Sequence, residues 1–336
     1  MEPVTVIIPT HNRADLLDGA IASVLAQEYR PLELLVVDDG SSDHTRQVVQ
    51  ARQQQLAGGR AAGPSALPAP ELRYFFRENG GAAAARNLGI RQARYDLLAF
   101  LDCDDRFQPG KLAAQAAAMA ANPHLLLSHT EEIWLRRGRH LNQKKRHRKE
   151  GGDLFARSLE LCVIGMSTVM LRRRLLEAVG NFDEALPCCE DYELWLRVTA
   201  RFPVLFIDRP FTEKHGGRDD QLSVRHRVGM DRLRIMALQK LLAGADLTPE
   251  QADLARRELV RKCRIYGRGC LKHGRREEGE GYLALAAASA DSGFPQPHFG
   301  VDGPEGAGNQ EDQGQHGGDR ARVGAPVQGG SGEIGG

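Results

Sequence analysis

Two aspartates, Asp102 and Asp104, come directly after an apolar run, residues 97–101, that predicts a buried strand. A strand that ends in this way projects two carboxylates from one turn. Hard cations such as Mg²⁺ and Mn²⁺ prefer oxygen ligands of this kind and often share them with substrate phosphates. An isolated pair of aspartates more often caps the following helix. The sequence favours a metal site here because other polar groups are expected at the same place.

Polar segments also follow the first two apolar runs of the chain. Residues 9–13 (PTHNR) come after the run 4–8, and residues 38–42 (DDGSS) come after the run 32–37. Each segment by itself is typical of a helix-capping loop. Because such runs alternate with helical patterns up to residue 101, they predict a mainly parallel α/β sheet. Ligands of these sheets bind at the carboxyl ends of the strands, where the polar segments meet.

A guanidinium and a second pair of acids complete the candidate site. Arg86 lies in a helical pattern that opens with Gly80 and Gly81, close to the same edge of the predicted sheet. Its planar group can bind phosphate or a base edge through two hydrogen bonds. Glu190 and Asp191 begin a later helical pattern, where acids are favoured for structural reasons alone. A carboxylate in this position could also remove a proton from an attacking hydroxyl group.

The remaining elements follow from periodicity. Further helices are expected at 43–56, 80–93, 111–121, 172–179 and 191–200, and further strands at 72–76, 125–135, 162–171 and 204–207. Asn12 is expected to cap the helix that starts after it.

Three stretches differ in composition from this pattern. Residues 57–70, rich in Ala, Gly and Pro, are expected to form a flexible insertion. Residues 231–290 predict two or three helices, and residues 291–336 are too poor in large apolar side chains to form a core, so we expect disorder there. The predicted organisation is therefore a sheet domain over 1–230, a helical appendage and a tail.

Composition limits the classes of function. The chain has 45 Lys and Arg against 44 Asp and Glu, and this near-zero net charge argues against a general nucleic-acid binder. The six cysteines form no Cys-x-x-Cys pair, which argues against a zinc knuckle or a disulfide framework and favours a reducing cytoplasm. No apolar run approaches the ~20 residues of a membrane helix, and the first residues lack the pattern of a signal peptide. We expect a cytoplasmic protein, at most bound to the inner face of the membrane.

The basic stretch 136–149 contains no acid. It is either a solvated surface or a site for a donor diphosphate, an anionic acceptor or an anionic membrane. Its candidate contacts are Lys144, Lys145, His147 and Lys149.

Five segments, taken in order, resemble the motifs of family 2 glycosyltransferases, which have a GT-A fold. They are residues 6–13 (VIIPTHNR), 36–43 (VVDDGSSD), 85–90 (ARNLGI), 100–105 (FLDCDD) and 189–197 (CEDYELWLR). The resemblance covers roughly residues 4–223. It implies transfer of a sugar, with inversion, from a nucleoside-diphosphate sugar to a hydroxyl of a saccharide or lipid-linked acceptor. A UDP-sugar and a role in cell-surface polysaccharide or glycoconjugate synthesis are the family-level expectations.

The resemblance also implies roles for single residues. Asp39 resembles the residue that binds the nucleoside, and the other nucleotide-sugar contacts implied are Pro9, Thr10, Asn12, Arg86 and Asp102. Asp102 and Asp104 match the family's Asp-x-Asp pair, with Asp104 as the direct ligand of Mn²⁺ or Mg²⁺. His215, in a loop that would close over the diphosphate, is a further metal candidate. Asp191 resembles the catalytic base, with Glu190 beside it.

Two other interpretations stay open. A non-catalytic module of the same fold would bind the nucleotide sugar without turnover, although the intact carboxylates argue against it. A sugar-phosphate nucleotidyltransferase would need a glycine-rich loop with a lysine near the first strand, which residues 9–13 do not supply. The sequence also lacks Gly-x-Gly-x-x-Gly after the first strand, which argues against a dinucleotide-dependent dehydrogenase.

Overall fold

The computed structural model describes residues 1–58, 69–221, 224 and 229–291. The chain divides into two units, Met1–Phe294 and Pro295–Gly336, and every structural statement below concerns the first. Most of the predicted insertion 57–70 and of the predicted disordered tail 291–336 lies outside the described residues. The helix α2, Thr45–Gly58, ends two residues beyond the predicted end at residue 56 and so includes the first two residues of the predicted insertion.

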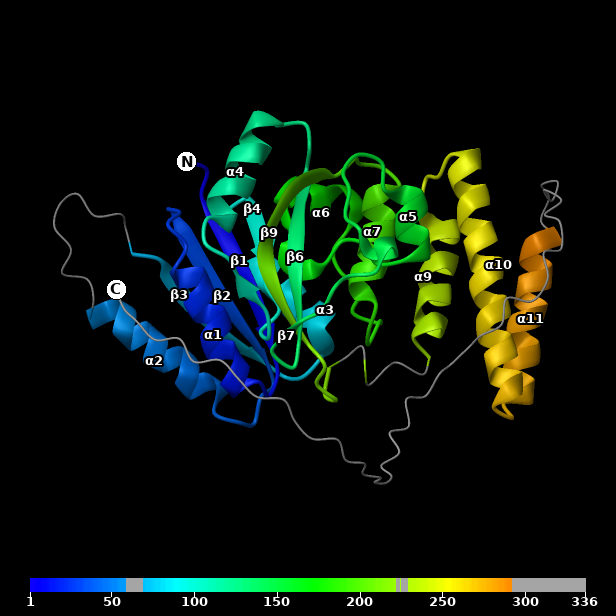
Figure 1. The fold of residues 1–336 in the computed structure, drawn as a ribbon, viewed down its shortest axis with the longest axis horizontal. Helices are drawn as coiled ribbons and strands as arrows, with labels where there is room; N and C mark the ends of the chain where they lie inside the picture. Colours follow the sequence, from blue (N-terminus) through cyan, green and yellow to red (C-terminus); the bar gives the residue numbers. More distant parts are fainter. Residues whose placement is uncertain (59–68, 222–223, 225–228, 292–336) are drawn as a thin grey trace, which may run out of the picture. The chain divides into compact units, whose positions relative to one another are not determined.

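The N-terminal half of the sheet is parallel, as predicted. Its strands lie in the order β3-β2-β1-β4 and are all parallel (Figure 1). Their bounds are β1 Val4–Thr10, β2 Leu32–Asp39, β3 Glu71–Arg77 and β4 Leu97–Phe100. Every residue of β1, β2 and β4 is buried, because helices cover both faces of this part of the sheet.

Alternate side chains of the strands enter two apolar cores. Ile8 and Val36 pack with one set of helices, and Ile7 and Leu35 pack with the other set on the opposite face. The first set comprises α1 Ala14–Leu25, α2 Thr45–Gly58 and α4 Lys111–Ala121. The second set comprises α3 Gly81–Gln92, α6 Arg173–Val179 and α7 Glu190–Thr199. The α/β class and the flanking helices are therefore confirmed.

The sheet continues beyond β4 with mixed directions. The order is β8-β6-β9-β5, in which β6 and β9 are parallel and the other neighbours are antiparallel, and β7 pairs with β6 off this path. The strands are β5 Arg106–Phe107, β6 Leu127–Arg136, β7 Arg139–His140, β8 Met170–Arg172 and β9 Leu205–Gly216.

Two strand predictions in this half were wrong in their bounds. β9 runs nine residues beyond the predicted end at residue 207. The exposed residues Asp208, Arg209 and Pro210, with a register shift opposite them, interrupt the apolar pattern of the strand. The predicted strand 162–171 is mostly irregular and contains a short helix, η2 Met166–Thr168. There the Thr168 hydroxyl donates to the Gly165 carbonyl at 2.6 Å, which favours a turn over an extended strand.

Three helices follow the sheet, at the upper end of our expectation of two or three. They are α9 Met230–Gly244, α10 Pro249–Lys272 and α11 Arg276–Asp291. α10 begins with a capping box, in which Thr248 and Gln251 exchange hydrogen bonds of 3.2 and 3.0 Å. A third apolar core joins α9 and α10 to α7, through contacts that include Tyr192 and Leu238. The boundary at residue 230 stays a prediction.

Two short helices complete the described elements, η1 Lys145–His147 and α5 Phe155–Glu160. Within the described ranges, none of the helices is both long and apolar enough to cross a bilayer.

Candidate active site

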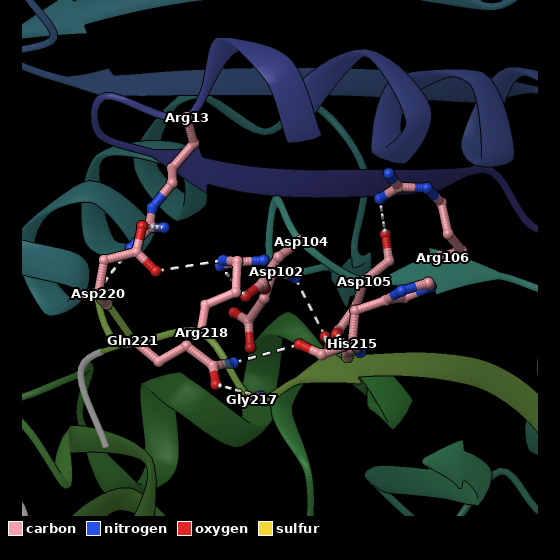
Figure 2. Close-up of polar contacts among 11 residues, drawn as sticks. Arg13, Asp102, Asp104, Asp105, Arg106, His215, Gly217, Arg218, Asp220 and Gln221 are labelled. Atoms are coloured by element: carbon pink, nitrogen blue, oxygen red, sulfur yellow. Dashed lines mark hydrogen bonds and ion pairs between the residues drawn. The ribbon is translucent and has the colours of Figure 1, made fainter. Parts of the chain in front are cut away.

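The two aspartates lie on a turn that leaves β4 at the expected edge of the sheet (Figure 2). The Asp105 amide donates to the Asp102 carbonyl at 2.9 Å, which closes the turn. The Asp105 carboxylate accepts hydrogen bonds from the Ser167 hydroxyl at 2.7 Å and from the His215 amide at 3.0 Å. Burial, with the nearby charge of Asp104, raises the pKa of Asp105 well above its usual range. Asp105 therefore anchors the turn and is not itself an exposed ligand.

The carboxylates of Asp102 and Asp104 suit a divalent cation that also takes phosphate ligands. Their side chains are 32% and 18% exposed, so a ligand can reach both. One oxygen of each is occupied, by Arg86 at 2.8 Å and by Arg218 at 2.8 Å. Among the residues that the structure describes, no set of three His, Cys, Asp or Glu side chains is arranged to hold a metal ion. Mg²⁺ and Mn²⁺ commonly accept one or two carboxylates together with water and substrate phosphates, and the pair fits that pattern.

His215 has another partner. Its ring lies 2.7 Å from the Glu213 carboxylate, and only its backbone amide contacts the aspartate turn. The structure therefore does not bring the imidazole to Asp102 and Asp104, and its role as a metal ligand stays a prediction.

Arg86 joins the aspartate turn to the second pair of acids. Its guanidinium extends from α3 and donates to Asp102 at 2.8 Å and to Glu190 at 2.5 Å, with the ring of Phe182 5.6 Å away. Burial alone would lower the pKa of Arg86, but the charges of Asp102 and Glu190 raise it. The side chain is 6% exposed. Arg86 is thus placed to orient two carboxylates, and the nucleotide contact that the resemblance implies for it stays a prediction.

Glu190 and Asp191 begin α7, as predicted, but their environments differ. Cys189, the residue before the helix, has a left-handed backbone with φ 65°, which turns the chain sharply into α7. Glu190 is buried against Arg86, and burial raises its pKa. Asp191 is partly exposed, and its second carboxylate oxygen accepts a hydrogen bond from the Cys162 thiol at 3.4 Å. Of the two acids, Asp191 is the one that a substrate hydroxyl can reach.

Asp39 holds the start of α3. Its carboxylate accepts hydrogen bonds from the amides of Gly80 at 3.1 Å and Gly81 at 2.7 Å, and Arg77 lies 3.2 Å away. The side chain is 5% exposed. The nucleoside contact implied for Asp39 stays a prediction.

The loop after β1 is tied to the loop after β2. The Asn12 side chain accepts hydrogen bonds from the amides of Ser42 at 2.8 Å and Asp43 at 3.3 Å. The expectation that Asn12 caps α1 was wrong, because its left-handed backbone, φ 50°, directs the side chain to the neighbouring loop. Asp43 instead accepts a hydrogen bond from the Ala14 amide at 3.1 Å.

Pro9 and Thr10 lie at the buried end of β1, beside this loop pair. The Thr10 hydroxyl is buried and has no hydrogen-bond partner within the described ranges. Pro9, Thr10 and Asn12 are near neighbours in the sequence, and the nucleoside contact implied for them stays a prediction.

A chain of ion pairs that sequence reasoning missed covers the aspartate turn. Arg218 bonds Asp104 at 2.8 Å and Asp220 at 3.2 Å, and Asp220 also pairs with Arg13 from the loop after β1 (Figure 2). Gln221 accepts a hydrogen bond from the Gly217 amide at 3.0 Å, which folds this segment back on itself. The arginine at 218, followed by two aspartates at 219 and 220 and preceded by two glycines, was the available signal.

Solved structures share the fold. TarS (residues 1–349) of S. aureus superposes with a TM-score of 0.62 at 19% identity and covers 86% of this chain and 80% of its own. The mannosyltransferase PcManGT of Pyrobaculum calidifontis, in complex with GDP-Man and Mn²⁺, gives 0.58 at 18% identity over 87% of this chain and 76% of its own. At these identities the likeness shows a common fold, which is the expected GT-A architecture.

Sequence relatives include glycosyltransferases. An uncharacterized glycosyltransferase of Rickettsia felis is 31% identical over 216 residues, 62% of this chain, which spans only about a third (32%) of that relative's length. The Escherichia coli UDP-Glc:alpha-D-GlcNAc-diphosphoundecaprenol beta-1,3-glucosyltransferase WfgD is 32% identical over 58% of this chain and 69% of its own. The family model described as glycosyl transferase family 2 matches residues 5–180, more than half of the chain. By this match, over the residues that build the aspartate turn and its sheet, the chain belongs to glycosyl transferase family 2.

Proposed function

We propose that this chain transfers a sugar, with inversion, from a nucleoside-diphosphate sugar to a hydroxyl group of a saccharide or lipid-linked acceptor. The observation that carries the proposal is the Arg86 bridge, which connects Asp102 of the aspartate turn at 2.8 Å to Glu190 of the α7 start at 2.5 Å. A phosphate-binding edge and a potential base therefore face one site.

Different residues act on different parts of the reaction. Asp191 accepts the proton of the attacking hydroxyl, whose oxygen bonds to the anomeric carbon on the face opposite the diphosphate. The bond from that carbon to the diphosphate oxygen breaks, and the diphosphate leaves with the electron pair. Asp102 and Asp104 would hold a divalent cation, Mn²⁺ or Mg²⁺, which when bound neutralises charge on the leaving diphosphate. Glu190, held by Arg86, keeps the start of α7 against the turn.

A UDP-sugar donor and a lipid-linked saccharide acceptor are the substrates we favour. Support comes from the named Escherichia coli relative, which uses UDP-Glc and a diphosphoundecaprenol-linked GlcNAc. These substrates would place the protein in cell-surface polysaccharide or glycoconjugate synthesis, in the cytoplasm or peripherally on the inner face of the membrane.

The first test is a thermal-shift screen of UDP, GDP, CDP and dTDP, each with and without Mn²⁺. A ligand that binds only the folded protein raises the melting temperature, so we expect a Mn²⁺-dependent increase with one nucleotide, UDP above all. Hydrolysis of the matching nucleotide sugar then separates an enzyme from a non-catalytic binding module, which would bind without turnover. A folded protein that responds to none of the four would contradict the proposal.

A further inference from the structure

Strand β9 directs one lysine, Lys214, to the aspartate turn. Side chains two residues apart share one face of a strand, so Lys214 lies on the same face as Thr212. The Thr212 hydroxyl donates to the Ser167 carbonyl at 2.9 Å, and the Ser167 hydroxyl donates to Asp105 at 2.7 Å. His215, one residue later, projects to the opposite face. The face of β9 toward the aspartate turn therefore carries the ammonium group of Lys214, where we expected the imidazole of His215.

A buried ion pair supports Lys214 from the neighbouring strand. The parallel register of β6 and β9 sets Trp134 beside Lys214 and Glu132 beside Thr212. The Glu132 and Lys149 side chains are only 4% and 3% exposed, and Lys149 Nζ lies 3.5 Å from Glu132 Oε1. The other oxygen, Oε2, is buried and accepts no hydrogen bond from any residue that the structure describes. Its charge is therefore available to attract the second lysine.

Lys214 is charged and its hydrogen-bond donors are open. Burial by itself would lower the pKa of Lys214, but the charges of Glu132, Asp105, Asp102 and Asp191 outweigh it and raise that pKa well above its ordinary value. In the part of the chain that the structure describes, no carboxylate lies within the 4.0 Å of an ion pair with Lys214. The residue is also partly exposed. An ammonium in this position can take an oxygen ligand from a substrate.

We propose that Lys214 binds the β-phosphate of the donor and stabilises the charge that this group gains as its bond to the sugar breaks. The inference rests on the proposed function. Lys214 shares its face of β9 with Thr212, which is linked through Ser167 to Asp105 of the aspartate turn. In the proposed function the diphosphate leaves beside that turn, where a preorganised cation favours the leaving anion. A phosphate on an anionic acceptor has the same chemistry, so the test uses nucleotides alone.

The test compares UDP with UMP, because UMP lacks the β-phosphate. Dissociation constants of both are measured by calorimetry with Mn²⁺ for the full chain and for Lys214→Met. We expect the variant to bind UDP about tenfold or more weakly, as for a lost hydrogen bond to a charged group, with UMP affinity unchanged. Lys272→Met is the matched control, since Lys272 is an exposed lysine at the end of α10, and it should retain the wild-type ratio of UDP to UMP affinity.

The ratio of UDP affinity to UMP affinity distinguishes failure of this inference from failure of the proposed function. An unchanged ratio in Lys214→Met, or an equal loss for both nucleotides, would overturn the inference while leaving the proposed function intact. Wild-type protein that binds neither nucleotide, nor GDP, CDP or dTDP, would instead overturn both. If Lys214→Met does not fold, Lys214→Gln keeps a polar side chain and should show the same selective loss for UDP.

Discussion

At the scale of single residues, the site is organised by charges that are buried together. A guanidinium removed from water is stable only where carboxylates accept its hydrogen bonds, and Arg86 finds Asp102 and Glu190 on two different elements. This bridge commits Glu190 to a positioning role. Asp191, beside it, is partly exposed, whereas Glu190 is buried.

The division of roles between the two acids predicts the behaviour of Asp191→Asn. An amide cannot take the proton of the attacking hydroxyl, so we expect kcat to fall by roughly 10²–10⁴, the usual contribution of a general base. The affinity for UDP with Mn²⁺ should not change, because the proposed base acts on the acceptor hydroxyl and not on the nucleotide. Steady-state kinetics and calorimetry check both. The control is Asp208→Asn, which replaces an exposed carboxylate on β9 and should leave activity unchanged. Full activity in Asp191→Asn would mean that another group is the base.

In the proposed function, Arg218 would compete with a metal ion for Asp104. Because Arg218 occupies one oxygen of Asp104 at 2.8 Å, a cation at the aspartate turn must displace it or share the carboxylate. In the presence of UDP we expect Arg218→Ala to bind Mn²⁺ up to about fivefold more tightly, as for loss of a partly exposed ion pair worth up to ~1 kcal/mol.

The measurement is the free Mn²⁺ signal in electron paramagnetic resonance, which does not depend on turnover. Arg209→Ala, an exposed arginine on the neighbouring strand β9, should leave Mn²⁺ affinity unchanged. Weaker Mn²⁺ binding in Arg218→Ala would show that Arg218 supports the cation site and does not compete with it.

At the scale of elements, the crossing of α10 and α11 depends on two glycines. A Cβ on Gly279 would lie 2.8 Å from the Gly267 carbonyl oxygen, and a Cβ on Gly267 would lie 2.9 Å from the Gly279 carbonyl oxygen. Backbone atoms cannot move aside as a flexible side chain can, so the absent side chains let the two helices approach closely.

We therefore expect opposite effects from two alanine substitutions in α11. Gly279→Ala should lower the free energy of unfolding by about 1–3 kcal/mol, as overpacking does. Gly281→Ala should raise it by up to ~1 kcal/mol, because a Cβ there meets nothing within 4 Å and alanine is the better helix former. Urea unfolding followed by circular dichroism measures both. Equal effects would mean that the helices do not cross as described.

At the scale of the whole described unit, the helices after the sheet are packed against the catalytic region. The core of α9 and α10 includes Tyr192 and Leu196 of α7, the helix that presents Asp191. The Lys262 ammonium donates to the Glu160 carbonyl at 3.1 Å, which ties α10 to α5. We infer that these helices hold α7 in place, whatever further contacts they make.

Stability should depend on pH through Lys111, a buried lysine for which the described residues supply no acidic partner. It lies over the Phe107 ring, 4.4 Å from its centre, and hydrogen-bonds Gln115 and the Thr168 carbonyl. Burial lowers the pKa of Lys111 from 10.5 to about 7. Between these two values the unfolded chain binds a proton that the folded chain does not. The free energy of unfolding should therefore rise with pH from about 7, by at most about 1.4 kcal/mol per pH unit.

The Lys111→Met variant tests this dependence. Its unfolding free energy, measured by urea titration at several pH values from 7 to 9, should rise less steeply than that of the wild type. Lys240→Met, which replaces a half-exposed lysine, should keep the wild-type slope. Equal slopes for Lys111→Met and the wild type would mean that Lys111 keeps its proton in the folded protein.

The sequence by itself determined the parallel half of the sheet, most helices and the set of acids at the strand ends. These depend on local rules: buried strands are continuous apolar runs, helices repeat every 3.6 residues, and strands of a parallel sheet end at one edge. The structure decided which charges meet. Arg86 and Glu190 are 104 residues apart, and Arg218 and Asp104 are 114 apart. Such pairs depend on how distant elements pack. The length of β9 depends on packing too, because its pairing with β6 extends the strand past residues that interrupt its apolar pattern.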